Sequence, residues 1–216
     1  MSKRYASIAF TDHVREVQDT YGSGSFYAKH VARGAGLDSG DALSDDAQEF
    51  LAARDSFYLA TVSETGWPYV QHRGGAPGFV RVIDEHTIGW ADFAGNLQYV
   101  TTGNLATDTR VALIAIDYPH RSRLKIFGRA SVVRAEDDPA LAQRLTVPGH
   151  DGTVERMVLV TIEAFDWNCP QHITPRYTLD ELGPRIAPMQ ERLRLLETDN
   201  DRLRRELESL KAASNS

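Results

Sequence analysis

The chain has 216 residues, of which 42% are hydrophobic and 9% aromatic, a composition that excludes wholesale disorder. It carries 24 Lys and Arg against 30 Asp and Glu, and this net charge of −6 argues against nucleic acid or an anionic membrane as the main partner. The sequence has no apolar run near the ~20 residues of a membrane span, and its single cysteine excludes an intrachain disulfide. We therefore expect a cytoplasmic protein with no membrane partner.

Residues 1–42 are predicted to be an N-terminal arm. A polar stretch from Asp12 to Thr20 has helical character, and Ser44 resembles a helix N-cap because two aspartates follow it. Between these two points, the density of helix-breaking glycines suggests an arm or loop that lies on another surface. These glycines are Gly22, Gly24, Gly34, Gly36 and Gly40.

Residues 43–178 are predicted to form a β-barrel with short peripheral helices. From Phe57 onward, apolar and polar residues alternate in short runs that turns separate, which is typical of antiparallel strands. A closed or half-closed barrel is expected because closure removes exposed strand edges. The expected strands are Phe57–Val62, Trp67–His72, Phe79–Ile83, Thr87–Trp90, Arg110–Tyr118, Arg123–Val133 and Met157–Trp167, and the expected helices are Gly95–Thr107 and Asp137–Leu145.

Residues 179–216 are predicted to be a C-terminal helix that forms a coiled coil. Two series of residues repeat every seven positions with an offset of three, as at the a and d positions of a heptad. Pro188 is expected in the first helical turn, where a missing N–H is tolerated. The a positions are Ile186, Leu193, Asn200 and Leu207, and the d positions are Met189, Leu196, Leu203 and Leu210.

The charges beside this series favour two parallel strands. The g residues Arg192, Asp199 and Glu206 each have a residue of opposite sign five positions on, at Glu197, Arg204 and Lys211. A buried asparagine at an a position, here Asn200, also specifies a two-stranded register. The alternative is an amphipathic helix packed on its own barrel. A leucine-zipper DNA reader is disfavoured, because the upstream residues 176–190 contain only two basic side chains.

Three blocks of polar residues at strand ends are candidate binding sites. Trp67–Gly75 ends in a glycine pair that lets a flat ligand approach the backbone, although a strand end with a bulge has the same pattern. Trp90–Gln98 leads into the predicted helix Gly95–Thr107. The free N–H groups at the start of this helix would bind phosphate; the alternative is an ordinary capped helix with no ligand. Trp167–Arg176 offers one cysteine and one histidine, too few ligands for zinc. The sequence therefore predicts no metal site and assigns no catalytic side chain.

Taken in order, four segments resemble the pyridoxamine 5'-phosphate oxidase-like, FMN-binding split-barrel proteins, in particular their large bacterial group of unassigned activity. The segments are FYLATVSETGWPYVQHRGG, WADFAGNLQYVTTGNLATDTRVALI, RLKIFGRA and WNCPQHITPR. The resemblance runs from about Leu43 to Arg176 and leaves the heptad tail outside. It implies a mainly β (α+β) split barrel, and a homodimer with one FMN in each of two clefts between the subunits.

The resemblance also implies which residues would contact the cofactor. One strand would run beneath the flavin, a second strand end would flank its ring, a turn would bind the phosphate, and a C-terminal segment would reach the cofactor, often from the second subunit. The strand beneath the flavin has Gln71, His72, Arg73 and Gly74, and the strand end that flanks the ring has Trp90, Ala91 and Asp92. The phosphate turn has Gly95, Asn96, Leu97 and Gln98, and Arg123 would face the flavin. The C-terminal segment has Asn168, Gln171 and Arg176.

Two departures from the family pattern bear on function. The oxidases usually carry Ser-Arg-Lys in the phosphate turn, whereas Gly95–Gln98 has no positive charge, so the phosphate would depend on Arg73, Arg123 and amide donors. Their substrate-binding Arg-x-His near the C-terminus is not recognisable. The resemblance thus favours an FMN-dependent oxidoreductase acting on an unidentified small molecule over the vitamin B6 oxidase itself. The alternatives are an F420-dependent reductase of the same barrel and a non-catalytic module that binds flavin or haem.

Overall fold

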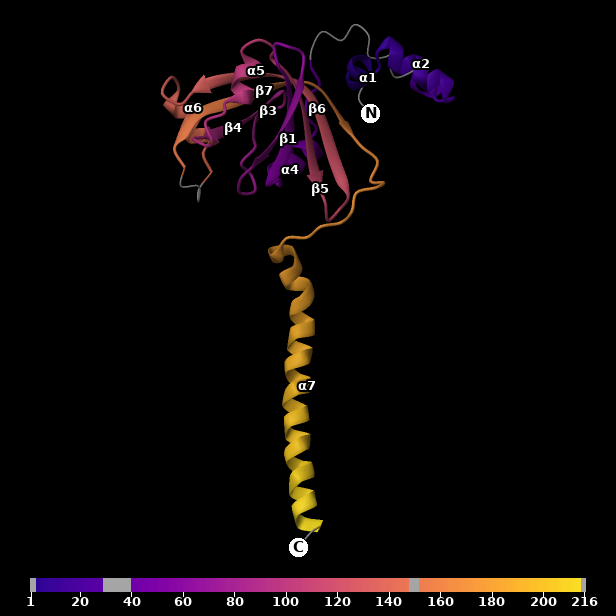
Figure 1. Ribbon diagram of the computed structural model, residues 1–216, viewed down its shortest axis with the longest axis vertical. Coiled ribbons are helices and arrows are strands. Elements are labelled where there is room, and N and C mark those ends of the chain that lie inside the picture. The colour runs from indigo at the N-terminus through magenta and orange to yellow at the C-terminus, as the bar shows by residue number, and fades with distance from the viewer. Residues whose placement is uncertain (1–2, 29–39, 148–151, 215–216) are drawn as a thin grey trace. The chain divides into compact units, whose positions relative to one another are not determined.

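The computed structural model describes residues 3–28, 40–147 and 152–214. The chain divides into two compact units, with the boundary between Ile173 and Thr174. The first unit is a curled β-sheet with short helices, and the second consists mainly of one long helix (Figure 1). Two glycines of the predicted arm, Gly34 and Gly36, lie outside the described residues.

The sheet of the first unit has seven strands, and every neighbouring pair is antiparallel. Their order across the sheet is β2-β1-β5-β6-β7-β4-β3, so β2 and β3 are the two edges. The strands are β1 (Ser56–Val62), β2 (Pro68–Gly74), β3 (Arg81–Asp84), β4 (Thr87–Phe93), β5 (Arg110–Asp117), β6 (Ser122–Arg134) and β7 (Val154–Trp167). The prediction of a mainly β fold is confirmed, and each predicted strand overlaps an observed one.

The alternation of apolar residues builds the core. Every second residue of β5 is buried, and β1 and β6 follow the same period of two through most of their length. The buried side chains face one shared interior because the sheet curls around them. Among the largest are Leu59, Ile88, Trp90, Leu124 and Ile126.

The first unit also contains short helices. Besides α1 (Lys3–Ala9) and α2 (Asp12–Thr20), they are α4 (Asp45–Ala52), α5 (Val100–Leu105) and α6 (Pro139–Leu145). Ser44 is the N-cap of α4, as predicted, although its side chain makes no capping bond. In α1, Tyr5 stacks on Phe127, and Arg4 forms an ion pair with Glu163 of β7. These contacts fasten α1 to the barrel.

The second half of β7 has a different neighbour from the first half. Strand β4 pairs with β7 only as far as Thr161. Beyond it, the backbone N–H of Asp41 donates to the carbonyl of Glu163 at 3.1 Å, and the Asp41 carboxylate accepts from the N–H of Phe165 at 3.2 Å. A Cβ on Gly40 would lie 2.0 Å from the carbonyl oxygen of Ile162, so only glycine allows this approach. We call residues 40–41 the edge strap.

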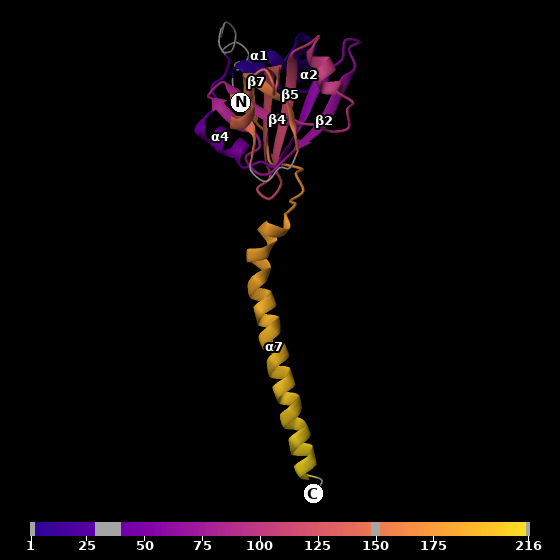
Figure 2. The ribbon, with the colours of Figure 1, turned by 90° about the vertical axis from the view of Figure 1, so that its left-hand side faces the viewer.

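Helix α7 (Leu179–Ser214) forms most of the second unit. It begins well before Pro188, so the prediction that this proline lies in the first turn is wrong. Both Pro184 and Pro188 lie inside the helix, where each removes a backbone hydrogen bond and favours a kink. The first turns of α7 are bent away from the straight remainder (Figure 2). Its a and d residues from Ile186 to Leu210 are exposed.

Candidate functional site

Two adjoining cavities open at one end of the barrel, with volumes of about 250 and 280 Å³. Strands β2 and β4 and the loop between β4 and α5 line both cavities. Four residues are common to the two linings: Arg73, Asp92, Phe93 and Gly95. Because the cavities share a wall, they form one continuous candidate site of the size that small-molecule and cofactor pockets have.

Local strand geometry determines which side chains face this site. On edge strand β2, the alternating residues Tyr69, Gln71 and Arg73 lie on one side because side chains repeat with a period of two. On β4, the pairing register with β7 shifts between Asp92 and Phe93, so both neighbours reach the cavity lining. Irregularities of this kind redirect side chains at the end of a sheet.

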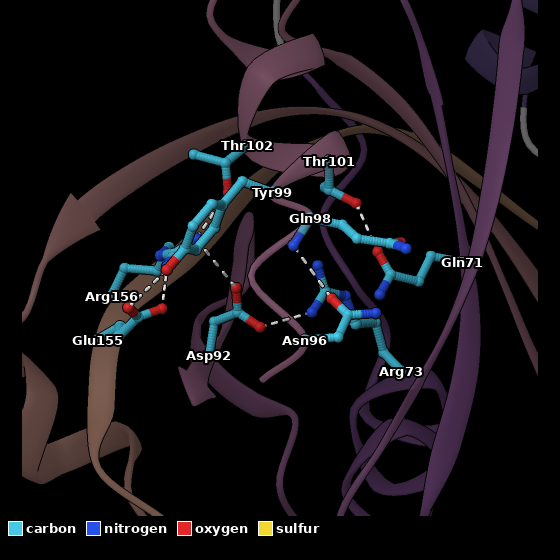
Figure 3. A network of polar contacts seen from close by, with 10 residues as sticks. All are labelled: Gln71, Arg73, Asp92, Asn96, Gln98, Tyr99, Thr101, Thr102, Glu155 and Arg156. Atoms are coloured by element: carbon cyan, nitrogen blue, oxygen red, sulfur yellow. Dashed lines mark hydrogen bonds and ion pairs between the residues drawn. The ribbon is translucent and has the colours of Figure 1, made fainter. Parts of the chain in front are cut away.

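An ion-pair network crosses the first cavity (Figure 3). The Nη1 atom of Arg73 lies 2.5 Å from Oδ1 of Asp92, and Oδ2 of Asp92 lies 3.9 Å from Nη1 of Arg156. All three side chains are largely buried, with 15%, 14% and 11% of their surface exposed. The contact between Arg73 and Asp92 joins edge strand β2 to β4 across the open side of the barrel, where strand pairing is missing.

Further contacts hold Arg156 in place. It donates to Oγ1 of Thr102 at 3.0 Å and pairs with Glu155, while its guanidinium lies 4.6 Å from the centre of the Tyr99 ring. The Tyr99 hydroxyl in turn donates to Glu155 at 3.0 Å. Ring stacking and hydrogen bonds together leave the Arg156 side chain little freedom, which suits a binding group.

The loop before α5 contains left-handed backbone at two residues with side chains. Leu97 has φ 60° and Tyr99 has φ 51°, and both conformations are uncommon outside glycine. The Asn96 side chain stabilises the loop by accepting from the N–H of Gln98 at 3.2 Å. These residues end any helix before Val100, so the prediction of a helix from Gly95 is wrong. The expected phosphate-binding residues Gly95–Gln98 lie in a turn, as the family resemblance implies.

Hydrogen bonds to neighbouring strands position α5. Thr101 donates from Oγ1 to Oε1 of Gln71 at 2.9 Å, and the buried Asn104 donates to Oγ1 of Thr61 at 2.9 Å. The helix thereby connects β1 and β2 to the rim of the cavity (Figure 3).

Within the part of the chain that the structure describes, two donor atoms of lining residues are buried without a hydrogen-bond partner. They are Nε of Arg73 and Nε1 of Trp90. An unpaired buried donor is costly, so each atom is suited to a ligand that accepts a hydrogen bond. Trp90 itself belongs to the core, since it is 1% exposed and its ring packs edge-on against Phe57.

Most of the residues predicted to bind a cofactor line these cavities. The structure brings eleven of them together there. Those of the first cavity are Gln71, Arg73, Asp92, Gly95, Asn96, Leu97 and Gln98, and those of the second include His72, Gly74, Trp90 and Ala91.

Four predicted residues lie elsewhere. Arg123 and Asn168 are joined by a backbone hydrogen bond of 3.1 Å at the start of β6 and the end of β7. Gln171 follows in the same segment, and Arg176 belongs to the second unit. Arg123, Asn168 and Gln171 line neither cavity within this one chain. Their role as cofactor ligands stays a prediction.

Sequence reasoning missed several residues of the site, above all Arg156. The strand was expected to begin at Met157, whereas β7 begins at Val154 and therefore includes Glu155 and Arg156. Within the sheet, Asp92 lies directly opposite Arg156, and pairs of opposite charge at such positions stabilise antiparallel strands. The contact between Asp92 and Arg156 could be predicted only if the pairing of β4 with β7 were known. The other lining residues of the first cavity that lie outside the predicted blocks are Tyr99, Val100, Thr101 and Thr102.

Comparison with known proteins identifies the family. The profile described as "Pyridoxamine 5'-phosphate oxidase" matches residues 43–154, more than half of the chain and all but the last part of the cavity lining. The chain belongs to this family. The match to the pyridoxamine 5'-phosphate oxidase profile ends at Val154, the first residue of β7, just before Glu155 and Arg156. No curated protein matches the sequence.

Solved structures of similar fold include a pyridoxamine 5'-phosphate oxidase-like protein of Lactobacillus delbrueckii, which is 24% identical, with a TM-score of 0.45 over 58% of this chain and 93% of that one. HupZ of Group A Streptococcus is 14% identical, with a TM-score of 0.46 over 62% and 99%. A structure titled F420 reductase is 23% identical, with a TM-score of 0.39 over 55% and 94%.

Among the helices of residues 3–28, 40–147 and 152–214, none combines the length and hydropathy that a membrane span requires. In the same residues, no three His, Cys, Asp or Glu side chains gather closely enough to hold a metal ion.

Proposed function

We propose that this protein is a cytoplasmic, homodimeric flavoprotein that binds FMN and transfers a hydride or electrons to or from a small molecule. The observation that carries the proposal is the buried, unpartnered Nε of Arg73 in the shared wall of two cavities, within a chain of the pyridoxamine 5'-phosphate oxidase family. A bound flavin supplies the redox chemistry itself, so the absence of an assigned catalytic side chain does not weigh against an enzyme.

The residues of the first cavity are suited to a phosphate group. The turn Gly95–Gln98 has no cation, but Arg73 and Arg156 approach the same cavity from β2 and β7. Asp92 lies between the two guanidinium groups, and Glu155 pairs with Arg156, so two carboxylates offset the charge of the two arginines. We infer that Arg156 provides the second positive charge that this turn lacks, and that Arg73 binds the phosphate through its free Nε.

The second cavity is suited to the flavin ring. Its lining is more apolar than that of the first and includes Phe79, Trp90 and Leu145. The glycine pair Gly74 and Gly75 leaves the backbone accessible along one wall. A planar ring beside Trp90 would also offer acceptor atoms to the unpartnered Nε1.

The outer face of the barrel supports the proposed dimer. Two apolar hollows of about 560 and 270 Å³ share Ala60, Ala112 and Phe127 on β1, β5 and β6. Tyr58 and Val70 extend this face and are exposed. A second barrel covering it would bury these side chains, and would allow Asn168 and Gln171 of the partner subunit to approach the cavities, as the family resemblance implies.

The first test is to identify the cofactor. The purified protein is expected to be yellow, with about one flavin per chain. Heat or acid denaturation should release a compound that co-migrates with FMN, and not with FAD, F420 or haem. Release of F420 would favour the reductase alternative. A colourless protein that also binds neither added FMN nor added F420 would contradict the proposal.

The second test concerns the phosphate. Arg73→Ala is expected to weaken FMN binding roughly 10- to 150-fold, because it removes a charge-assisted hydrogen-bonding partner. His172→Ala is the control, since this exposed residue lines neither cavity. Titration of the apoprotein, followed by flavin fluorescence, measures both affinities. A loss of less than about threefold would place the phosphate away from Arg73.

A further inference from the structure

Helix α7 has an exposed apolar seam along its length. The residues of this seam occupy the a and d positions of successive heptads, and none of the 36 residues of the helix is buried. Such a seam on a single helix is unfavourable in water, and pairing with another helix is the usual way to bury it. The seam consists of Ile186, Met189, Leu193, Leu196, Leu203, Leu207 and Leu210.

Outside the seam, several charged residues of the helix pair with one another. Arg194 pairs with Glu191, and Arg202 pairs with both Asp199 and Glu206, at 3.2–3.3 Å for the last two. These pairs lie within one helix, at spacings of three or four residues. They leave the apolar seam as the surface through which α7 would associate.

The charges beside the seam select a second copy of the same helix as the partner. In a parallel pair, the g residue of one helix faces the e residue of the other, five positions on. Arg192, Asp199 and Glu206 would then face Glu197, Arg204 and Lys211 of the partner subunit. Every one of these contacts joins opposite charges, and symmetry repeats each contact on the other side of the seam.

The antiparallel arrangement is less favourable. In the register that best aligns the two seams, Arg192 and Glu197 would still face opposite charges, at Glu206 and Lys211 of the partner subunit, but Asp199 would face the partner subunit's Asp199, and Arg204 would face the partner subunit's Arg204. This register also places the Asn200 amide opposite Leu203 of the partner subunit, where it has no hydrogen-bonding group to meet. In the parallel arrangement, the two Asn200 side chains meet and bond to each other.

We propose that α7 forms a parallel, two-stranded coiled coil with α7 of a second copy of this chain. The paired region begins after Pro188, because the two prolines bend the first turns. The apolar seam stabilises the pair, while the exposed ion pairs determine its orientation. This inference concerns a different unit from the cofactor cavities and does not depend on FMN binding.

Disulfide trapping in the full-length protein tests the pairing. Cys169 is first replaced by serine, which leaves no other cysteine. Leu196→Cys at a d position should then crosslink under mild oxidation roughly ten times faster than the matched control Thr198→Cys, because only the former brings two thiols within disulfide distance. Thr198 occupies an f position, on the side of the helix away from the seam, and so reports random collisions between tails.

A mixture of two variants tests the orientation. Leu207 is the residue that the antiparallel register places opposite Leu196. When Leu196→Cys and Leu207→Cys chains are mixed and oxidised, the parallel coil predicts crosslinks within each variant and few between them. Predominant crosslinks between the two variants would overturn the parallel arrangement. Equal rates for Leu196→Cys and Thr198→Cys would overturn the coiled coil itself.

Discussion

The barrel and helix α7 use apolar residues in opposite ways. In the barrel, Leu59 is 1% exposed, because neighbouring strands of the same chain cover it. In α7, Leu203 is 55% exposed, although it belongs to an equally regular apolar pattern. A periodic apolar pattern therefore predicts that a surface will be buried. Whether the surface that covers it belongs to the same chain depends on the fold.

The same difference applies to charges. In the barrel, Arg54 and Asp117 lie 2.9 Å apart with 15% and 12% of their side chains exposed. Burial alone would raise the pKa of Asp117, but the His120 N–H, Arg54 and the His120 ring together lower it below its usual value. In α7, Arg194 and Arg202 keep more than half of their side-chain surface exposed. The pair of Arg54 and Asp117 links distant parts of the chain, whereas the pairs of α7 link neighbouring turns.

The largest expected effect comes from matched leucine truncations in the two units. Leu59→Ala should lower the free energy of unfolding of the barrel by about 2–5 kcal/mol, because it leaves a cavity in a packed core. Leu203→Ala should leave the barrel nearly unchanged at high protein concentration. Tryptophan fluorescence during urea unfolding measures the barrel alone, since Trp67, Trp90 and Trp167 all belong to the first unit.

Protein concentration makes this comparison decisive. Any stability that Leu203→Ala removes should return as concentration rises, because association of two chains depends on concentration. The loss caused by Leu59→Ala should persist at every concentration. A loss for Leu203→Ala that is similar to that for Leu59→Ala, and independent of concentration, would instead show that α7 packs on its own barrel.

A smaller effect is expected from two glutamates whose pKa values are both lowered. A hydrogen bond from Arg4 is the main cause at Glu163, and one from Arg194 at Glu191. A lowered pKa in the folded state means that ionisation stabilises the fold above the ordinary value of 4.5, and that this stabilisation is lost as pH falls through the lowered pKa.

Only the glutamate in the barrel joins distant elements, so only its replacement should be measurable. Glu163→Gln is expected to lower the free energy of unfolding by about 0.5–1 kcal/mol at pH 7, and the difference from the parent protein should shrink in acid. Glu191→Gln, on the exposed face of α7, should have no measurable effect. Unfolding curves between pH 7 and pH 3 compare the two. A pH-independent difference for Glu163→Gln would contradict the assigned ionic role.

The sequence predicted those features that depend on local periodicity. The alternating strands and the long heptad helix are examples, because each pattern is complete within a few residues of the chain. The start of α5 was predicted wrongly, since nothing local shows that Leu97 and Tyr99 adopt left-handed backbone. Arg156 was missed because its role depends on pairing with Asp92, a residue far away in sequence. Contacts of this kind become visible only when the sheet order is known.

The edge strap on β7 bears on how this protein avoids self-association through exposed strand edges. Beyond Thr161, the backbone of β7 would otherwise offer unpaired N–H and carbonyl groups to any extended peptide, including β7 of another molecule. Asp41 occupies two of these bonding positions, at Glu163 and Phe165, and Gly40 lies too close to Ile162 for any larger residue to replace it. Residues 40–41 therefore cover part of a strand edge that could otherwise pair with another molecule.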